Sequence, residues 1–102
     1  MKRGVGTVLT KVPEGSREVI RVLLDDQLYT LEEIAGKLDK FELGTIRYAI
    51  RRLLETRLIQ SIPDLYDMRT VKYRIASEST LSTVLNTLPP EVYREIEDLF
   101  SK

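Results

Sequence analysis

The sequence contains no cysteine and no histidine. Without cysteine the chain can form no disulfide framework, no thiolate metal site and no thiol nucleophile. Without histidine it lacks the commonest general base and the commonest protein metal ligand. It also shows no HExxH, phosphate-loop, GxSxG or calcium-loop pattern. These absences predict that the protein is not an enzyme and uses no metal or other cofactor.

Long hydrophobic runs are also missing. No apolar stretch approaches the roughly 18–20 residues that span a bilayer. The basic start Met1-Lys2-Arg3 is followed by residues 4–11, which are too few and too polar for the core of a signal peptide. We therefore expect a cytoplasmic protein without a membrane partner.

Residues that are easily damaged at high temperature are scarce. Cysteine and tryptophan are absent, Asn86 is the single asparagine, and Gln27 and Gln60 are the two glutamines. Together with 31% charged residues, this usage favours a thermophilic source.

What is present fits one globular domain. The chain has 102 residues, of which 42% are hydrophobic, and its formal net charge is zero. The charge is unevenly spread. Residues 40–74 carry eight Lys and Arg against four Asp and Glu, whereas residues 77–102 carry two against five. A basic middle and an acidic tail suit an anionic partner for the middle only.

Three helices are expected in the first half. Ser16 is a good N-cap for a helix over 17–26, because its hydroxyl can accept from an amide of the first turn. A capping box from Thr30 to Glu33 opens a helix over 31–38. After a polar turn, apolar residues at helical spacing predict a third helix over 42–57.

The hydrophobic period then changes from about 3.6 to 2. Strands are expected over 58–62 and 71–75, joined by a long loop, and residues 1–12 could form an arm or an edge strand. Two amphipathic helices, over 79–88 and 91–100, complete the chain. The order predicts a mainly α fold with a β-hairpin (α+β).

The pattern resembles the winged helix-turn-helix domain of small bacterial and archaeal transcriptional regulators. The resemblance covers residues 16–76. It is carried by the segments Thr30–Ala35 with Leu38, Thr45–Leu54, Arg57–Ile59 and Tyr73–Ile75. Two positions depart from the family, which often has Gly where Arg57 stands and Gly in the turn that Asp39-Lys40 fills here.

The resemblance implies three parts: an N-terminal arm (1–15), the winged helix-turn-helix domain (16–77) and a helical C-terminal extension (78–102). The extension's apolar stripes could cover the domain's own core or pair with a second copy, and we expect a homodimer. No effector can be identified from the sequence.

The resemblance also implies double-stranded DNA as the partner, with the helix over 42–57 in the major groove. Arg47 and Arg51 lie one turn apart and could each make a bidentate contact to guanine. Thr45 could contact a base, and Tyr48 could stack or donate to a phosphate, or could instead pack against the wing.

Further basic residues suit the DNA backbone. Arg52 and Lys40 are candidate phosphate ligands, and Arg69 is the only basic residue of the hairpin loop, where the resemblance implies the minor groove. Lys72 and Arg74 share one face of the second strand and could add contacts, or could simply face solvent. Tyr66 and Tyr73 are expected to be structural.

Other functions stay open at this stage. The zero net charge and the single basic wing residue also fit a winged helix that binds protein within a larger transcription or chromosome-maintenance assembly. A non-specific DNA binder fits less well, because such proteins rely on many phosphate contacts.

Overall fold

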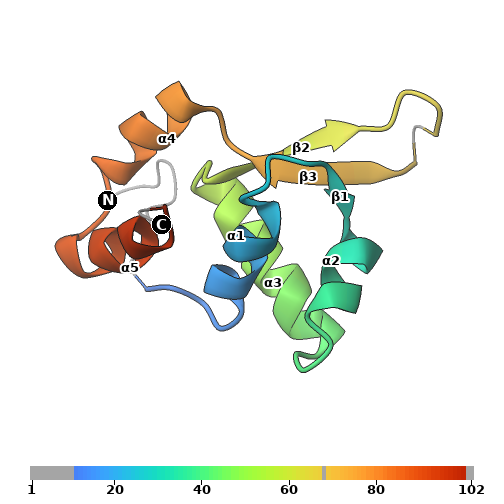
Figure 1. Cartoon of the computed structure of the whole chain (residues 1–102), viewed down its shortest axis with the longest axis horizontal. Helices are drawn as coiled ribbons and strands as arrows, with labels where there is room; N and C mark the ends of the chain where they lie inside the picture. The colour runs from blue at the N-terminus through green and yellow to red at the C-terminus, as the bar shows by residue number, and fades with distance from the viewer. Residues whose placement is uncertain (1–10, 68, 101–102) are drawn as a thin grey trace, which may run out of the picture.

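The computed structural model describes residues 11–67 and 69–100. Within these ranges the chain forms five helices and a three-stranded antiparallel sheet (Figure 1). The elements in chain order are α1 (Ser16–Leu23), β1 (Tyr29–Thr30), α2 (Leu31–Lys37), α3 (Leu43–Glu55), β2 (Ile59–Pro63), β3 (Val71–Ile75), α4 (Glu78–Leu85) and α5 (Pro90–Phe100). The expected fold class is confirmed. Most of the arm expected over residues 1–12 lies outside the described residues.

The start of α1 differs from the expectation. Gly15, not Ser16, is the N-cap, and no side chain caps the helix. Ser16 is fully buried as the first helical residue, and its Oγ has no hydrogen-bond partner within the described part of the chain. The backbone explains the change, because Ser16 N donates to Pro13 O at 3.0 Å and Gly15 adopts φ 85°. Glycine adopts that left-handed conformation without steric cost.

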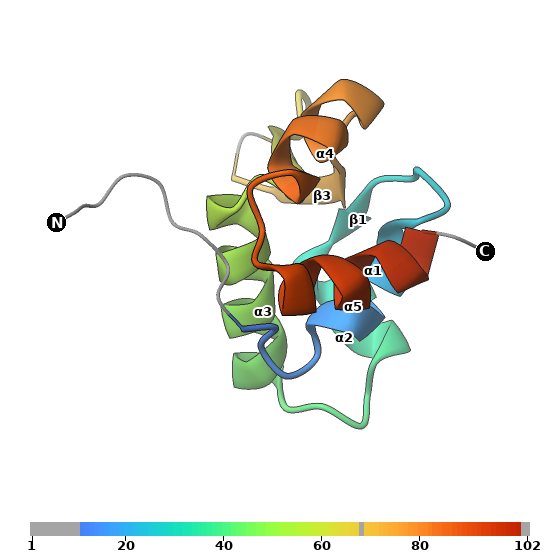
Figure 2. The same cartoon turned by 90° about the vertical axis from the view of Figure 1, so that its left-hand side faces the viewer.

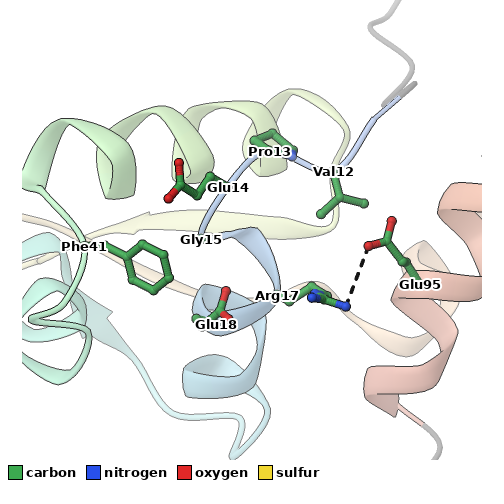
Figure 3. Close-up of a pocket in the computed structure, with 8 residues that line it drawn as sticks. All are labelled: Val12, Pro13, Glu14, Gly15, Arg17, Glu18, Phe41 and Glu95. Carbon is green, nitrogen blue, oxygen red and sulfur yellow. Dashed lines mark ion pairs between the residues drawn. The ribbon is translucent and has the colours of Figure 1, made fainter.

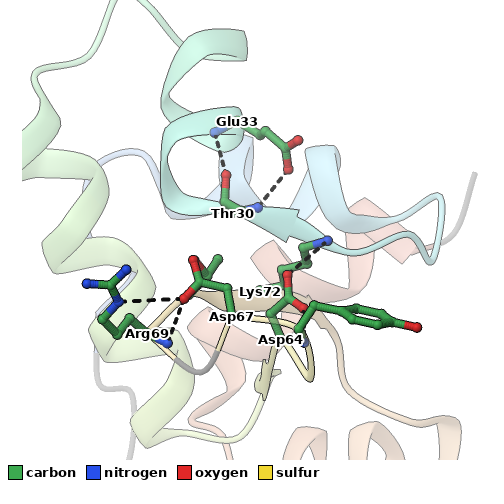
Figure 4. A network of polar contacts seen from close by, with 8 residues as sticks. Thr30, Glu33, Asp64, Asp67, Arg69 and Lys72 are labelled. Atoms are coloured by element: carbon green, nitrogen blue, oxygen red, sulfur yellow. Dashed lines mark hydrogen bonds and ion pairs between the residues drawn. The ribbon is translucent and has the colours of Figure 1, made fainter.

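The capping box of α2 is confirmed. Thr30 Oγ1 accepts from the Glu33 amide at 3.1 Å, and Glu33 Oε1 accepts from the Thr30 amide at 2.8 Å (Figure 4). Two amides that would otherwise lack a partner are thereby satisfied. This fixes the point at which the chain leaves β1 and enters the helix that precedes α3.

The end of α3 is a Schellman turn. The amide of Leu58 donates to Leu53 O and the amide of Arg57 donates to Leu54 O, both at 3.0 Å. Both Leu53 and Leu58 are buried, which supplies the hydrophobic contact that accompanies this motif. Arg57 adopts φ 68°, so the residue that replaces the family's glycine is held in a left-handed conformation.

The sheet has the strand order β1-β3-β2. The hairpin of β2 and β3 pairs Ile59 with Ile75 and Pro63 with Val71. The short strand β1 was not among the expected elements; its Tyr29 lies opposite Tyr73 across an antiparallel pair. This third strand ties the base of the wing to the start of α2.

One core joins all the helices. Its sixteen buried members are Val19, Ile20, Leu23, Ile34, Ile46, Ala49, Ile50, Leu53, Leu58, Ile59, Ile75, Val84, Leu88, Val92, Ile96 and Leu99. The last five come from α4, α5 and the turn between them, which holds Leu88, so the apolar stripes of both helices cover the domain's own core. Figure 2 shows α5 lying against α1. No helix in residues 11–67 and 69–100 is long and apolar enough to cross a membrane.

Several boundaries shift by one to three residues. The helix expected over 17–26 ends at Leu23, and the helix expected over 79–88 spans Glu78–Leu85. Both ends are closed by turn hydrogen bonds, such as Leu24 N to Arg21 O. Helix ends commonly fray into such turns, which hydrophobic periodicity alone does not locate.

Because Arg57 is strained, the substitution Arg57→Gly should stabilise the protein. We expect the free energy of unfolding to rise by about 0.5–1 kcal/mol, since the left-handed cost for a residue with a Cβ exceeds the extra chain entropy of glycine. Urea denaturation measures the change. The matched control Arg47→Gly, in the middle of α3, should lower stability by about 1 kcal/mol. A lower urea midpoint for Arg57→Gly would contradict the explanation.

Candidate nucleic-acid interface

Helix α3 has one buried and one exposed face. Ile46, Ala49, Ile50 and Leu53 are buried in the core. The opposite face carries Arg47, Tyr48 and Arg51, which are all exposed. We call these three residues the α3 face. The packing of one side of the helix therefore fixes the direction in which these three side chains point.

The two arginines of the α3 face keep their charge available. Within residues 11–67 and 69–100, neither Arg47 nor Arg51 forms an ion pair. The guanidinium of Arg51 instead lies over the ring of Tyr48, with 5.5 Å between its carbon and the ring centroid. Such a cation–π contact orients the guanidinium while leaving its donors exposed.

The residues expected beside this face are less available. Arg52 is only partly exposed and forms an ion pair with Glu55 one turn away. Thr45 is partly buried and lines a shallow hollow with Tyr48, Glu14 and Glu42. Lys40 is exposed in the turn between α2 and α3. The N-terminal end of α3 is thus flanked by carboxylates, which repel phosphate.

The two cations of β3 are also paired. Arg74 Nη2 lies 2.7 Å from Asp26 Oδ1, which connects the sheet to the turn after α1. Lys72 Nζ lies 4.0 Å from Asp64 Oδ2 at the start of the wing loop. Contacts of these two side chains with DNA stay a prediction, and each would have to compete with a carboxylate of the same chain.

Two aspartates of the wing loop, Asp64 and Asp67, accept hydrogen bonds from its described residues (Figure 4). Asp64 Oδ1 accepts from the Tyr66 amide at 2.8 Å. Asp67 accepts from the Arg69 amide at 3.1 Å and from the Thr70 hydroxyl at 2.8 Å. The hydroxyl of Thr70, followed by the amide of Arg69, lowers the pKa of Asp67 below its usual value of 3.8.

The expectation that both tyrosines are structural holds for one of them. Tyr73 is partly buried against the core. Tyr66 is 100% exposed, and its neighbour Leu65 is 84% exposed, so packing does not explain either side chain. The sequence held a signal that was not used: two apolar residues in succession between the turn-forming Asp64 and Asp67.

A separate hollow of about 200 Å³ lies between α1, α5 and the turn before α3 (Figure 3). Its charged residues are Glu14, Glu18, Arg17 and Glu95, and an ion pair of 3.7 Å between Arg17 and Glu95 joins α1 to α5. Its acidic lining makes it unsuited to phosphate. Within the described residues, no group of three or more Asp, Glu, His or Cys side chains is arranged to hold a metal ion.

Comparison with solved structures identifies the fold. A zinc-responsive MarR family member, Lactococcus lactis ZitR, matches with a TM-score of 0.57 and 21% identity, over 99% of this chain and 80% of that one. The adhesin competence repressor AdcR from Streptococcus pyogenes matches with a TM-score of 0.60 and 15% identity, over 89% and 63%. The chain has the winged helix-turn-helix fold.

A mutant of MarR from E. coli, complexed with operator DNA, matches this winged helix with a TM-score of 0.54 and 15% identity, over 81% of this chain and 60% of that one. No family model matches the chain. No curated protein matches it either. Among these solved proteins, AdcR is described as a repressor and the MarR mutant is bound to operator DNA.

The turn of the wing gives a prediction about pH. Thr70→Val removes the main hydrogen bond to Asp67, so the pKa of Asp67 should rise towards 3.8. Because the folded pKa is lowered, the stabilisation is present at neutral pH and is lost as the pH falls through the folded pKa. Carboxyl ¹³C NMR titration measures this pKa. Thr83→Val in α4 should leave it unchanged, and an unchanged value in Thr70→Val would contradict the assignment.

Proposed function

We propose that this chain binds double-stranded DNA sequence-specifically and regulates transcription, with α3 in the major groove and the wing at the minor groove. The observation that carries the proposal is the α3 face: two exposed arginines without an ion pair in the described chain, on the exposed side of the helix that follows the turn. A major groove is wide enough for one helix, and arginine recognises guanine by two parallel hydrogen bonds.

The contact between Tyr48 and Arg51 supports base recognition over simple solvation. An unrestrained arginine side chain loses considerable rotamer entropy when it binds. Stacking on Tyr48 holds the Arg51 guanidinium near one orientation before DNA arrives, which lowers that cost. Arg47, one turn earlier, then supplies a second donor group on the same side of the helix. Recognition of operator DNA by a solved protein of the same fold is consistent with this arrangement.

The remaining cations have supporting roles in the proposal. Lys40 and Arg69 are exposed and suited to phosphates or groove walls. Thr45 is partly buried beside Tyr48, and in the proposal it contacts a base. Contacts from Arg52, Lys72 and Arg74 would require their present ion pairs to loosen. Such a protein would act in the cytoplasm and would need no catalytic group.

A second function has one observation in its favour. Several cations of the basic stretch 40–74 already form ion pairs with carboxylates of the same chain, and the chain's net charge is zero. A winged helix that binds another protein within a larger assembly would need no large positive field. The binding experiment below separates the two functions.

Replacing both arginines of the α3 face should abolish specific binding. The double variant Arg47→Ala/Arg51→Ala should lose about 1–3 kcal/mol for each base contact, or tenfold or more in affinity per residue. Fluorescence anisotropy with a mixed-sequence duplex pool at two salt concentrations, followed by selection of the preferred site, measures this loss.

The matched control removes the same charge elsewhere. Arg21→Ala/Arg94→Ala changes exposed arginines of α1 and α5 and should leave the affinity within about twofold, because surface charges away from an interface act weakly through screening. Equal affinities of the α3 variant and the wild type, with both folded by circular dichroism, would remove α3 as the reader. A folded wild type that binds no duplex at low salt would favour the protein-binding function.

We also propose a homodimer, although less apolar surface is left for it than the sequence suggested. The buried stripes of α4 and α5 are used within the chain, so a second copy would have to use what is left exposed. Leu24, Leu81 and Phe100 line a hollow where α1, α4 and α5 meet, and they offer an apolar edge for that purpose. Two-fold symmetry would match two half-sites on DNA.

Light scattering at tens of micromolar tests the dimer. We expect twice the 11.8 kDa of the chain. The substitution Leu81→Lys should reduce the mass to that of one chain, since it places a charge on the apolar edge. A mass of 11.8 kDa for the wild type would rule out this dimer.

A further inference from the structure

The tip of the wing exposes two large apolar side chains. Leu65 and Tyr66 are 84% and 100% exposed, whereas no other exposed large hydrophobic residue in the described chain exceeds 49%. The wing projects from the end of the molecule opposite α4 and α5 (Figure 1). A display of this kind opposes the hydrophobic effect, so folding of the free chain does not account for it.

Both side chains lie in a segment whose backbone is held by hydrogen bonds. The amide of Asp64 donates to Thr70 O at 2.9 Å, and the amide of Thr70 donates to Asp67 O at 2.8 Å. The side chain of Asp64 receives the amide of Tyr66 itself. These bonds fix the backbone that carries the apolar pair. Residues 64–67 are thus held by hydrogen bonds before any partner binds, which lowers the entropy cost of binding.

The carboxylates of the tip do not prevent its approach to DNA. Asp67 is paired with Arg69 at 3.7 Å and Asp64 with Lys72 at 4.0 Å. Residues 64–72 therefore carry two acidic and two basic groups, with no net charge. The side chain of Arg69 is 95% exposed and can turn towards a phosphate.

The size of the tip favours a groove over a protein surface. Two such side chains bury at most about 300–400 Å² together. A stable protein interface needs about 800 Å² from each partner. A minor groove is about 6 Å wide and admits a narrow hairpin end, and proteins that enter it commonly insert apolar side chains between base steps.

We propose that Leu65 and Tyr66 form an apolar wedge that enters the minor groove of DNA and unstacks one base step, with Arg69 at the groove wall. The wedge rests on the proposed function and deepens it. The Schellman turn at Arg57 leads directly from α3 into β2, and the far end of β2 leads to the wedge. Recognition then includes the ease with which a step opens, which favours flexible steps such as TA.

The experiment uses the duplex selected in the binding assay, with 2-aminopurine replacing one adenine at a time. Fluorescence of this base rises when it loses its stacking neighbours. Saturating wild-type protein should raise the signal at one step only. The double variant Leu65→Ala/Tyr66→Ala should give no rise and bind about tenfold more weakly, a loss typical of one aromatic–base contact. Energy transfer between dyes at the duplex ends reports the accompanying bend.

Three variants serve as controls. Tyr66→Phe keeps the ring and should keep the signal. Arg69→Ala should weaken binding but keep the rise at saturation. Leu28→Ala removes an apolar side chain that is 44% exposed in the link between α1 and β1, outside the α3 face, the wing and the proposed dimer edge, and should change neither readout.

The outcomes separate this proposal from the proposed function. If the wild type binds its site but no step unstacks, or if the double variant keeps the rise, the wedge is overturned and DNA binding stands. If the wild type binds no duplex, the proposed function fails and the wedge fails with it. A rise that only Leu65→Ala/Tyr66→Ala loses supports the wedge.

Discussion

The left-handed conformation of Arg57 fixes how the wing is placed relative to the α3 face. The two hydrogen bonds of the Schellman turn stop α3 and send the chain into β2 at a fixed angle. An extra helical turn there would displace the hairpin relative to the α3 face. Arginine adopts this left-handed conformation at a cost, and the buried contact of Leu58 with the helix end offsets that cost. The geometry is therefore maintained by packing rather than by the residue's own preference.

The hydrophobic core fixes the orientation of α3 from the buried side of the helix. Helix α3 is fixed in rotation because Ile46, Ile50 and Leu53 are buried among α1 and the sheet. Helices α4 and α5 then close the remaining apolar surface. Since the domain satisfies its own core, the exposed residues of α3 and the wing contribute little to stability. They can therefore vary while the fold is retained.

Local patterns in the sequence predicted most of the elements. The capping box at Thr30 and Glu33, the buried stripe of α3 and the strand over 71–75 each depend on neighbours a few residues away, and each is confirmed. The errors concern distant partners. Ser16 was predicted as a cap but is buried, because Gly15 takes that position. The pairing of β1 with β3 and the ion pair between Arg74 and Asp26, which are 48 residues apart, follow from tertiary packing that periodicity does not report.

The pairing of cations with carboxylates of the same chain has a consequence for how such a protein would find its site. Each phosphate contact displaces a condensed counterion, and that release supplies most non-specific affinity. With Arg52, Lys72 and Arg74 already paired, fewer ions would be released on a random stretch of DNA. The protein would therefore dissociate quickly from wrong sequences and would sample DNA by many short encounters instead of long sliding.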